Sequence, residues 1–210
     1  MVAIVPAGAD LTALAEAAAS CRGCDLWQDT TGTVFGEGDP ASPMVLVGEQ
    51  PGDQEDRRGR PFVGPAGRVL DRALAGVGVP RERVWITNTV KHFKHRTDER
   101  TGRRLHVTPD PADVGACRPW VAAELNVIRP LVVVTLGATA AKALLPPSYR
   151  VTRDRGKVLE GPPGSGAVIV GTIHPSAILR GPQEEQEQAL AGLVADLRVA
   201  VEEVRRRRSG

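Results

Sequence analysis

The 210-residue sequence has few aromatic side chains, no long apolar run and only three cysteines. Phe, Trp and Tyr make up 3% of the residues, which excludes a broad base-stacking surface built from many rings. No stretch approaches the ~20 apolar residues of a transmembrane helix, and the N-terminus lacks the basic segment of a signal peptide. We therefore expect a cytoplasmic protein without a membrane span. An odd number of cysteines also argues against a disulfide framework.

The rest of the composition is that of a globular protein with nearly balanced charge. A hydrophobic fraction of 41% is enough for a sizeable core, and the length predicts a single domain over residues 1–210, with a core of about 10–204. The net charge of +2 neither requires nor excludes a nucleic-acid partner, so the distribution of basic residues matters more. They gather at 57–60 and 91–104, and again at 205–210, where we expect a solvated tail.

Short β-branched runs alternate with longer segments of helical period, an order typical of a parallel sheet covered by helices. We expect an α/β fold, a single three-layer domain with a central, mainly parallel four-stranded sheet flanked by helices. The predicted strands span residues 44–47, 84–88, 131–136 and 168–170, and a run at 158–159 is expected to form a hairpin with the last. The predicted helices span residues 10–20, 65–76, 114–128 and 183–206, with one more after Gly137.

Two motifs follow predicted strands directly. Gly48-Glu49-Gln50-Pro51-Gly52 comes after the strand at 44–47, and His174-Pro175-Ser176 comes after the strand at 168–170. Parallel strands end at the same edge of a sheet, and open α/β sheets bind ligands at that edge. We therefore expect the two motifs to form opposite walls of one pocket.

The three cysteines suggest a metal site but leave its identity open. Cys21 and Cys24 have the C-x-x-C spacing of a metal or redox pair, but they follow a predicted helix, whereas a thioredoxin-like pair opens one. Cys117 lies on an apolar stripe, where a buried free cysteine is common. A four-ligand site then needs a histidine, and His92 and His95 are the local candidates. Such a set suits structural zinc as well as a cluster.

Four segments, taken in order, resemble the motifs of iron–sulfur uracil-DNA glycosylases, and the UdgX branch of that superfamily is the most similar. They are residues 48–52, 59–67, 88–92 and 174–180, so the resemblance covers roughly residues 21–180. It implies a uracil-DNA glycosylase-like fold. It also implies uracil-containing DNA as the substrate, including single strands, with free uracil as the product and a monomer as the acting form.

The resemblance assigns roles to three side chains that would meet the base. Excision breaks the C1′–N1 bond, so the sugar becomes oxocarbenium-like and uracil leaves as an anion. Phe62 would stack on the base, Asn88 would read its O4/N3 edge, and His174 would donate to its O2. An amide reads this edge well because cytosine presents the reversed pattern. Each residue also has an ordinary alternative: a core ring, a strand-end turn residue and a turn cap.

The remaining motif residues are expected to shape the pocket and hold the DNA. Gly48 and Gly52 allow main chain to approach the base closely. Ser176 and nearby main-chain N–H groups are expected to hold a phosphate. Gln50 stands where ordinary iron–sulfur uracil glycosylases have Ala, and Pro51 completes the same substrate-binding wall.

Residues 102–106 resemble the Lys-Arg-Arg-Ile-His loop that distinguishes the UdgX branch, with Gly102 in place of the Lys and Leu105 in place of the Ile. In that branch the loop His becomes covalently bound to the sugar C1′ after the base leaves, which implies the same role for His106. A neutral imidazole, with a reference pKa of ~6.5, is a competent nucleophile near pH 7. From the residues alone, a solvated loop histidine that contacts phosphate is the simpler interpretation.

The same resemblance places Glu49 on the sugar side of the pocket, where its carboxylate polarises the nucleophile. If Glu49 accepts a hydrogen bond from one nitrogen of His106, the other nitrogen presents its lone pair. Asp53 is a weaker candidate for orienting the nucleophile. Arg104 is expected to hold the loop, which we predict to run without regular structure over residues 91–108, through phosphate or carboxylate contacts.

His92 stands where a Val-Lys-Cys segment supplies a ligand in ordinary iron–sulfur uracil glycosylases, which puts it ahead of His95. Since excision is not a redox reaction, the implied 4Fe–4S cluster would be structural, with zinc as the alternative. The implied ligands are Cys21, Cys24, His92 and Cys117.

Three hypotheses for function remain. The first is a uracil-DNA glycosylase that cross-links itself to the abasic sugar through His106. The second is a conventional glycosylase that releases uracil and turns over. The third is a non-catalytic DNA-binding metal protein, which would have no use for Glu49, Asn88 and His174 together.

Overall fold

The computed structural model describes residues 2–162 and 164–209. Its centre is a six-stranded sheet with the order β1-β3-β2-β6-β8-β7. The inner strands β3, β2, β6 and β8 are parallel, and the short edge strands β1 and β7 are antiparallel to their neighbours. The strands are β1 Glu37–Gly38, β2 Met44–Gly48, β3 Trp85–Asn88, β6 Val132–Leu136, β7 Val158–Glu160 and β8 Val168–Thr172.

The predicted fold class is confirmed, with a wider sheet than expected. The sheet has six strands rather than four: the expected hairpin of β7 with β8 is confirmed and adds one strand, and the two-residue β1, which was not expected, extends the other edge. The α-helices are α1 Leu11–Ala19, α2 Asp53–Arg58, α3 Pro65–Gly76, α4 Pro111–Ile128, α5 Ala138–Leu144, α6 Val151–Asp154, α7 Pro175–Arg180 and α8 Gln186–Ser209. Short 3₁₀ turns are η1 Asp25–Asp29, η2 Arg81–Arg83 and η3 Gln183–Glu185.

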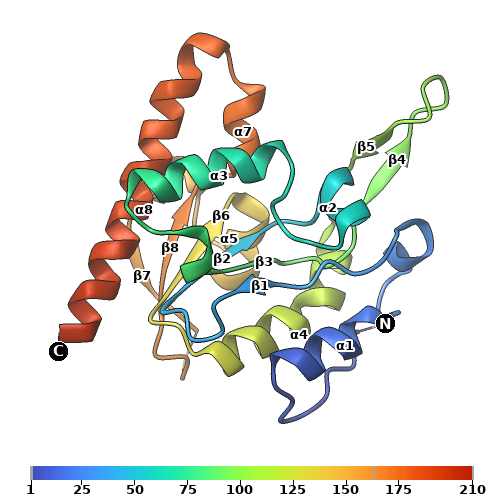
Figure 1. Ribbon diagram of the computed structural model, residues 1–210, viewed down its shortest axis with the longest axis horizontal. Helices are drawn as coiled ribbons and strands as arrows, with labels where there is room; N and C mark the ends of the chain where they lie inside the picture. Colours follow the sequence, from blue (N-terminus) through green and yellow to red (C-terminus); the bar gives the residue numbers. More distant parts are fainter. Residues whose placement is uncertain (1, 163, 210) are drawn as a thin grey trace.

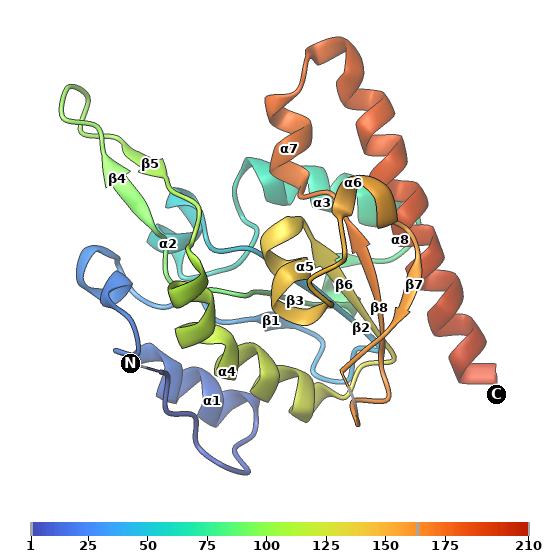
Figure 2. The same ribbon diagram turned by 180° about the vertical axis from the view of Figure 1, so that it is seen from behind.

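Helices cover both faces of the sheet. In Figures 1 and 2, α3, α7 and α8 lie on one face, and α4 and α5 lie on the other, with α1 packed outside α4. Every residue of β2, β6 and β8 is buried. This double coverage explains why these strands read as continuous apolar runs in the sequence.

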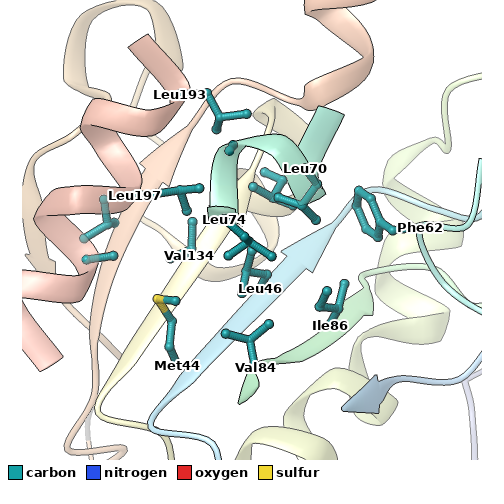
Figure 3. Packing of buried hydrophobic residues seen from close by; sticks show 14 of the residues in the cluster. Met44, Leu46, Phe62, Leu70, Leu74, Val84, Ile86, Val134, Leu193 and Leu197 are labelled. Atoms are coloured by element: carbon teal, nitrogen blue, oxygen red, sulfur yellow. The ribbon is translucent and has the colours of Figure 1, made fainter. Parts of the chain in front are cut away.

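Alternate residues of β2 supply two separate cores. Met44 and Leu46 pack toward α3 and α8, whereas Val45 and Val47 pack toward α4 and α5. Figure 3 shows the first core, in which leucines of α3 and α8 converge on Leu46. Phe62 lies at the rim of that core, beyond the C-terminal end of β2. The apolar packing therefore reaches the edge of the sheet where both motifs lie.

Two segments differ from expectation. Residues 91–108 contain the antiparallel hairpin β4 His95–Thr97 and β5 Arg104–His106, rather than an unstructured loop. Each strand has only three residues, and Leu105 is the one apolar side chain among them, so the strands carry no apolar alternation for sequence analysis to detect. Figure 1 shows the hairpin projecting from the body of the molecule beside α2.

The basic tail is also more ordered than expected. Helix α8 continues to Ser209, since Arg206 and Arg207 pair with Glu203 at 2.7 and 2.6 Å. Gly210, the last residue of the expected tail, lies outside the described residues. Within residues 2–162 and 164–209, no helix is both long and apolar enough to cross a membrane.

The N-cap of α1 contributes to the stability of the fold and lies outside both motifs. Asp10 caps α1 by accepting a hydrogen bond from the amide of Ala13 at 2.9 Å. We predict that Asp10→Ala lowers the free energy of unfolding by about 1 kcal/mol, as measured by urea titration. Glu16→Ala, an exposed change within the same helix, should alter it by less than about 0.5 kcal/mol. Equal effects of the two substitutions would contradict the assigned cap.

Candidate active site

Both motifs lie at the C-terminal edge of the parallel strands and line one cavity. Gly48 ends β2, Gly52 is the N-cap of α2, and His174 is the N-cap of α7 just beyond β8. The cavity has a volume of about 1080 Å³. Of the twelve non-metal residues expected at the site, all but Gly48 and Pro51 line it: Glu49, Gln50, Gly52, Asp53, Phe62, Asn88, Arg104, His106, His174 and Ser176.

Gly48 contacts the side chains of Phe62 and Asn88. A Cβ atom at this position would collide with Asn88 Oδ1 and with the Phe62 ring, so only glycine allows both side chains to approach the backbone here. Phe62 has the left-handed backbone angle φ 52°, which is uncommon for a bulky residue. The main-chain carbonyl of Phe62 packs against Gly67, and a Cβ atom at Gly67 would collide with it. This turn aims the Phe62 ring at the pocket, with its centroid 5.8 Å from that of His174.

Asn88 is buried, and its Oδ1 has no hydrogen-bond partner among the described residues. The main chain of Asn88 is fixed by a hydrogen bond, in which Lys91 Nζ donates to the Asn88 carbonyl at 3.0 Å. Lys91 is itself buried and pairs with the buried Glu124 at 2.6 Å. A buried polar atom without a partner is costly, so Asn88 Oδ1 is an acceptor available to a ligand N–H group.

His174 has a defined tautomer. Its Nδ1 accepts the main-chain N–H of Ser176 at 3.1 Å and the Ser176 hydroxyl at 2.7 Å, so the proton of the neutral ring is on Nε2. Burial lowers the pKa of His174 to about 4, despite the opposing effect of nearby Glu49. Nε2 is buried without a partner among the described residues. The pocket therefore contains a neutral imidazole with an unused N–H donor.

Ser176 differs from the expectation of a free phosphate ligand. Both its main-chain N–H and its hydroxyl are directed to His174, and Arg180 Nη1 donates to the Ser176 oxygen at 3.0 Å. The reason is local geometry, because Ser176 is the second residue after the N-cap His174. Ser176 thus orients the histidine.

Glu49 and His106 line the same cavity and contact each other. The carboxylate oxygen Oε1 lies 3.0 Å from His106 Nε2, and Oε2 accepts a hydrogen bond from the Thr139 hydroxyl. Burial works against ionisation of Glu49, but the hydrogen bonds from His106 and Thr139 outweigh it and lower the pKa below its usual value. Glu49 is therefore a fixed carboxylate at neutral pH.

Gln50 fastens the hairpin to this wall. Its Nε2 donates to the carbonyls of Lys94 and Val107, at 3.2 and 2.9 Å, and its Oε1 accepts the amide of Lys94 at 2.8 Å. Lys94 and Val107 sit at the base of the hairpin, directly before β4 and after β5. All of the amide's polar atoms are thus used by main chain, so Gln50 positions the strand that carries His106.

This anchor leads to a testable expectation for the hairpin. Gln50→Ala removes the side-chain partners of the Lys94 amide and the Val107 carbonyl, both of which belong to half-buried residues, and we expect this to cost roughly 1–3 kcal/mol of local stability. We predict that hydrogen exchange of the β4 and β5 amides becomes at least about tenfold faster. Gln54→Ala on α2 is the matched control, since Gln54 makes no side-chain hydrogen bond to other described residues. Unchanged exchange in Gln50→Ala would show that the hairpin is held by other contacts.

Arg104 is held by carboxylates, one of the two contact types expected for it. Its Nε donates to Asp53 Oδ1 and its Nη1 to Asp56 Oδ2, both at 2.6 Å. Asp53 also pairs with Arg57 at 2.9 Å, so its oxygens are directed to arginines rather than to Glu49. Asp56 is buried and accepts the amide of Thr31 at 3.1 Å. The network ties the hairpin to α2 and to the chain before β1.

Sequence analysis missed several residues that shape the site. Glu55 accepts the amides of Gly52 and Gly64, at 3.1 and 2.7 Å, and so joins the two segments that bear Glu49 and Phe62. The signal was present, since an acidic residue three positions after an N-cap is a capping-box pattern. Asp56 and Thr139 carried no such signal, because their partners are distant in sequence.

The cysteines lie near one another, with Cys21 and Cys24 just after α1 and Cys117 on α4. Trp120 Nε1 donates to Cys21 Sγ at 3.3 Å, and the amide of Lys91 donates to Cys117 Sγ at 3.2 Å. Burial raises the pKa of the Cys117 thiol to about 12 and also raises the pKa of Cys24. His92 Nδ1 is buried and has no partner in the described part of the chain.

These donors suit a metal group chemically, since three thiols and one orphaned imidazole nitrogen belong to this region. Across residues 2–162 and 164–209, however, no three His, Cys, Asp or Glu side chains are grouped closely enough to hold a metal ion as they stand. The alternative ligand His95 is on β4, where its Nδ1 contacts the Phe93 carbonyl at 3.0 Å and its ring stacks on Phe93.

Known proteins match most of the chain. A family model described as the uracil DNA glycosylase superfamily matches residues 35–198. A type-4 uracil-DNA glycosylase of Archaeoglobus fulgidus is 36% identical over 173 residues, which cover 80% of this chain and 82% of that protein. A type-4 uracil-DNA glycosylase of Thermotoga maritima is 35% identical over 173 residues, covering 82% and 84%. The family match spans the inner sheet, both motifs and the hairpin.

Proposed function

The chain belongs to the uracil DNA glycosylase superfamily, and on that premise we propose that it excises uracil from DNA and then links His106 to C1′ of the abasic sugar. The single observation that carries the second part is the 3.0 Å contact between His106 Nε2 and Glu49 Oε1 inside the cavity. This chemistry would place the chain in the UdgX branch.

Base recognition and departure are proposed for the wall opposite His106. A uracil flipped out of DNA would stack on Phe62 and donate its N3–H to the orphaned Asn88 Oδ1. As the C1′–N1 bond breaks, its electron pair leaves with the base, and the developing charge on O2 accepts the free Nε2–H of His174. A neutral histidine is suited to this role, because Nδ1 is held by Ser176 and the single ring proton is therefore on Nε2, which has no protein partner among the described residues.

The covalent step uses the other wall. As an imidazole nitrogen of His106 forms its bond to C1′, the proton of the ring N–H passes to the Glu49 carboxylate, so the linked imidazole ends neutral. The uracil anion takes up a proton from solvent. An imidazole bound in this way is a poor leaving group, so we expect the adduct to persist. The fixed, ionised Glu49 supports this assignment, since it is already hydrogen-bonded to the nucleophile.

A denaturing gel tests the proposal. Protein mixed with a uracil-containing single-stranded oligonucleotide should give a band that survives heat and detergent, together with one free uracil per adduct. Thymine in place of uracil should give neither. Uracil release without a retarded band would instead support a conventional glycosylase that turns over. DNA binding without uracil release would indicate the non-catalytic alternative. Duplex DNA run in parallel tests the proposed acceptance of single strands.

We propose a structural 4Fe–4S cluster held by Cys21, Cys24, His92 and Cys117. Thiolate sulfur suits iron–sulfur chemistry, and the orphaned His92 Nδ1 is the nearest unused donor in sequence to the amide that contacts Cys117. When bound, the cluster would cross-link the N-terminal segment to α4 and to the start of the hairpin. About four iron atoms and about four sulfides per chain, with a visible absorption band, would support it. Zinc without visible absorption would contradict it.

A further inference from the structure

Thr139 touches the Glu49 carboxylate from the side opposite to His106. Its hydroxyl donates to Oε2, while Oε1 contacts His106 Nε2 at 3.0 Å. The two contacts fix the plane of the carboxylate and leave each oxygen with an assigned partner. No motif in the sequence marks Thr139, and it has no place in the recognition of the base described above.

The position of Thr139 is set by contacts with both walls. It is the second residue of α5, whose N-cap Gly137 has the left-handed angle φ 90°. The Gly137 amide donates to the Thr172 carbonyl at 2.9 Å, and a Cβ on Gly137 would approach the His174 Cβ to 2.9 Å. The start of α5 is therefore docked against the end of β8, which fixes the backbone from which the Thr139 hydroxyl reaches Glu49.

The contact between Thr139 and Glu49 affects which nucleophile the carboxylate can activate. A carboxylate beside an oxocarbenium-like sugar is able to act as a general base toward water as well as toward an imidazole. Water attack forms a C1′–O bond, passes a proton to the carboxylate and leaves a free abasic site. Imidazole attack forms the C1′–N bond and passes the ring proton to the same carboxylate. An oxygen already bonded to a hydroxyl donor is a poorer base for water.

We propose that Thr139 is a positioning residue that directs Glu49 toward His106 and away from water, and so sets the ratio of covalent adduct to free abasic DNA. The inference rests on the proposed function, since it concerns the fate of the sugar after excision. Thr139 does not touch the reacting atoms and acts through Glu49.

Thr139→Val and Thr139→Ser test the role with matched shapes. Each variant is mixed in excess with single-stranded uracil DNA, and total uracil, heat-stable adduct and alkali-cleavable abasic sites are measured in the same reaction. We expect Thr139→Val to lower the ratio of adduct to abasic DNA roughly tenfold or more, because a hydrogen bond to a charged group is lost. Thr139→Ser keeps the hydroxyl and should stay within about twofold of the wild type.

Each outcome separates the two proposals. A Thr139→Val protein that releases uracil with the wild-type ratio overturns the role of Thr139 and leaves the proposed function intact. An equal fall in uracil release and adduct, with the ratio unchanged, also overturns it, because the effect would then be on folding or binding alone. A wild-type protein that releases uracil and forms no adduct overturns the proposed function itself. A second readout is the acid side of the pH profile for adduct formation, which should move to higher pH in Thr139→Val.

Discussion

Replacing His106 by alanine is expected to abolish the heat-stable adduct while leaving uracil release measurable. The variant removes the group that would bond to C1′, and the space it vacates admits water beside Glu49. The sugar cation would then be captured by water, so free abasic DNA should appear and the protein should turn over. The assay follows adduct and abasic sites over time, with DNA in excess of protein.

His95→Ala is the matched control for this change. His95 pairs with His106 in the register of the hairpin, but its Nδ1 contacts the Phe93 carbonyl rather than Glu49. Both substitutions remove an imidazole from the β4–β5 hairpin, so a general loosening of the hairpin would lower adduct formation in both variants. We expect His95→Ala to retain adduct formation. A His106→Ala protein that still cross-links would eliminate His106 as the nucleophile.

Replacing His174 by phenylalanine is expected to slow uracil release by about 10²–10³-fold, the usual cost of losing one donor to a developing anion. Phenylalanine keeps a planar ring at this position, whereas the Nε2–H donor and the Nδ1 acceptor of the imidazole are lost. The measurement is the single-turnover rate of uracil release at saturating protein. Because burial holds the pKa of His174 to about 4, the wild-type ring is neutral and its Nε2–H is present throughout the neutral range.

His174→Gln serves as the partial replacement. A carboxamide carries an N–H donor, so the rate should recover part of the loss seen with phenylalanine. A His174→Phe protein that releases uracil within tenfold of the wild-type rate would show that the anion is stabilised elsewhere. Comparable losses in both variants would mean that neither a ring nor an N–H donor alone replaces the imidazole.

The sheet and the position of the pocket were predictable because they follow from local patterns. Continuous apolar runs such as 131–136 identify strands buried on both faces, and the glycine turn after Met44–Val47 marks the ligand-binding edge. The N-cap at Asp10 and the helix at Pro65 are likewise encoded within a few residues. These features needed no knowledge of distant contacts.

The long-range side-chain contacts that position the site were not predictable in the same way. The hairpin has no alternating pattern, and one of the residues that hold it is Gln50, whose partners lie 44 and 57 positions away. Thr139 meets Glu49 across 90 positions, and Arg104 meets Asp56 across 48. Such contacts depend on how the layers pack, so a single sequence contains no local signal for them.

The most direct test of the covalent proposal is peptide mapping of the protein–DNA adduct. Wild-type protein is reacted with a single-stranded uracil oligonucleotide, digested with protease and nuclease, and sequenced by tandem mass spectrometry. We predict one modified peptide, with the mass of the remaining deoxyribose fragment localised to His106. An adduct localised to another residue, or uracil release without any modified peptide, would contradict the assignment of His106 as the group that takes the sugar.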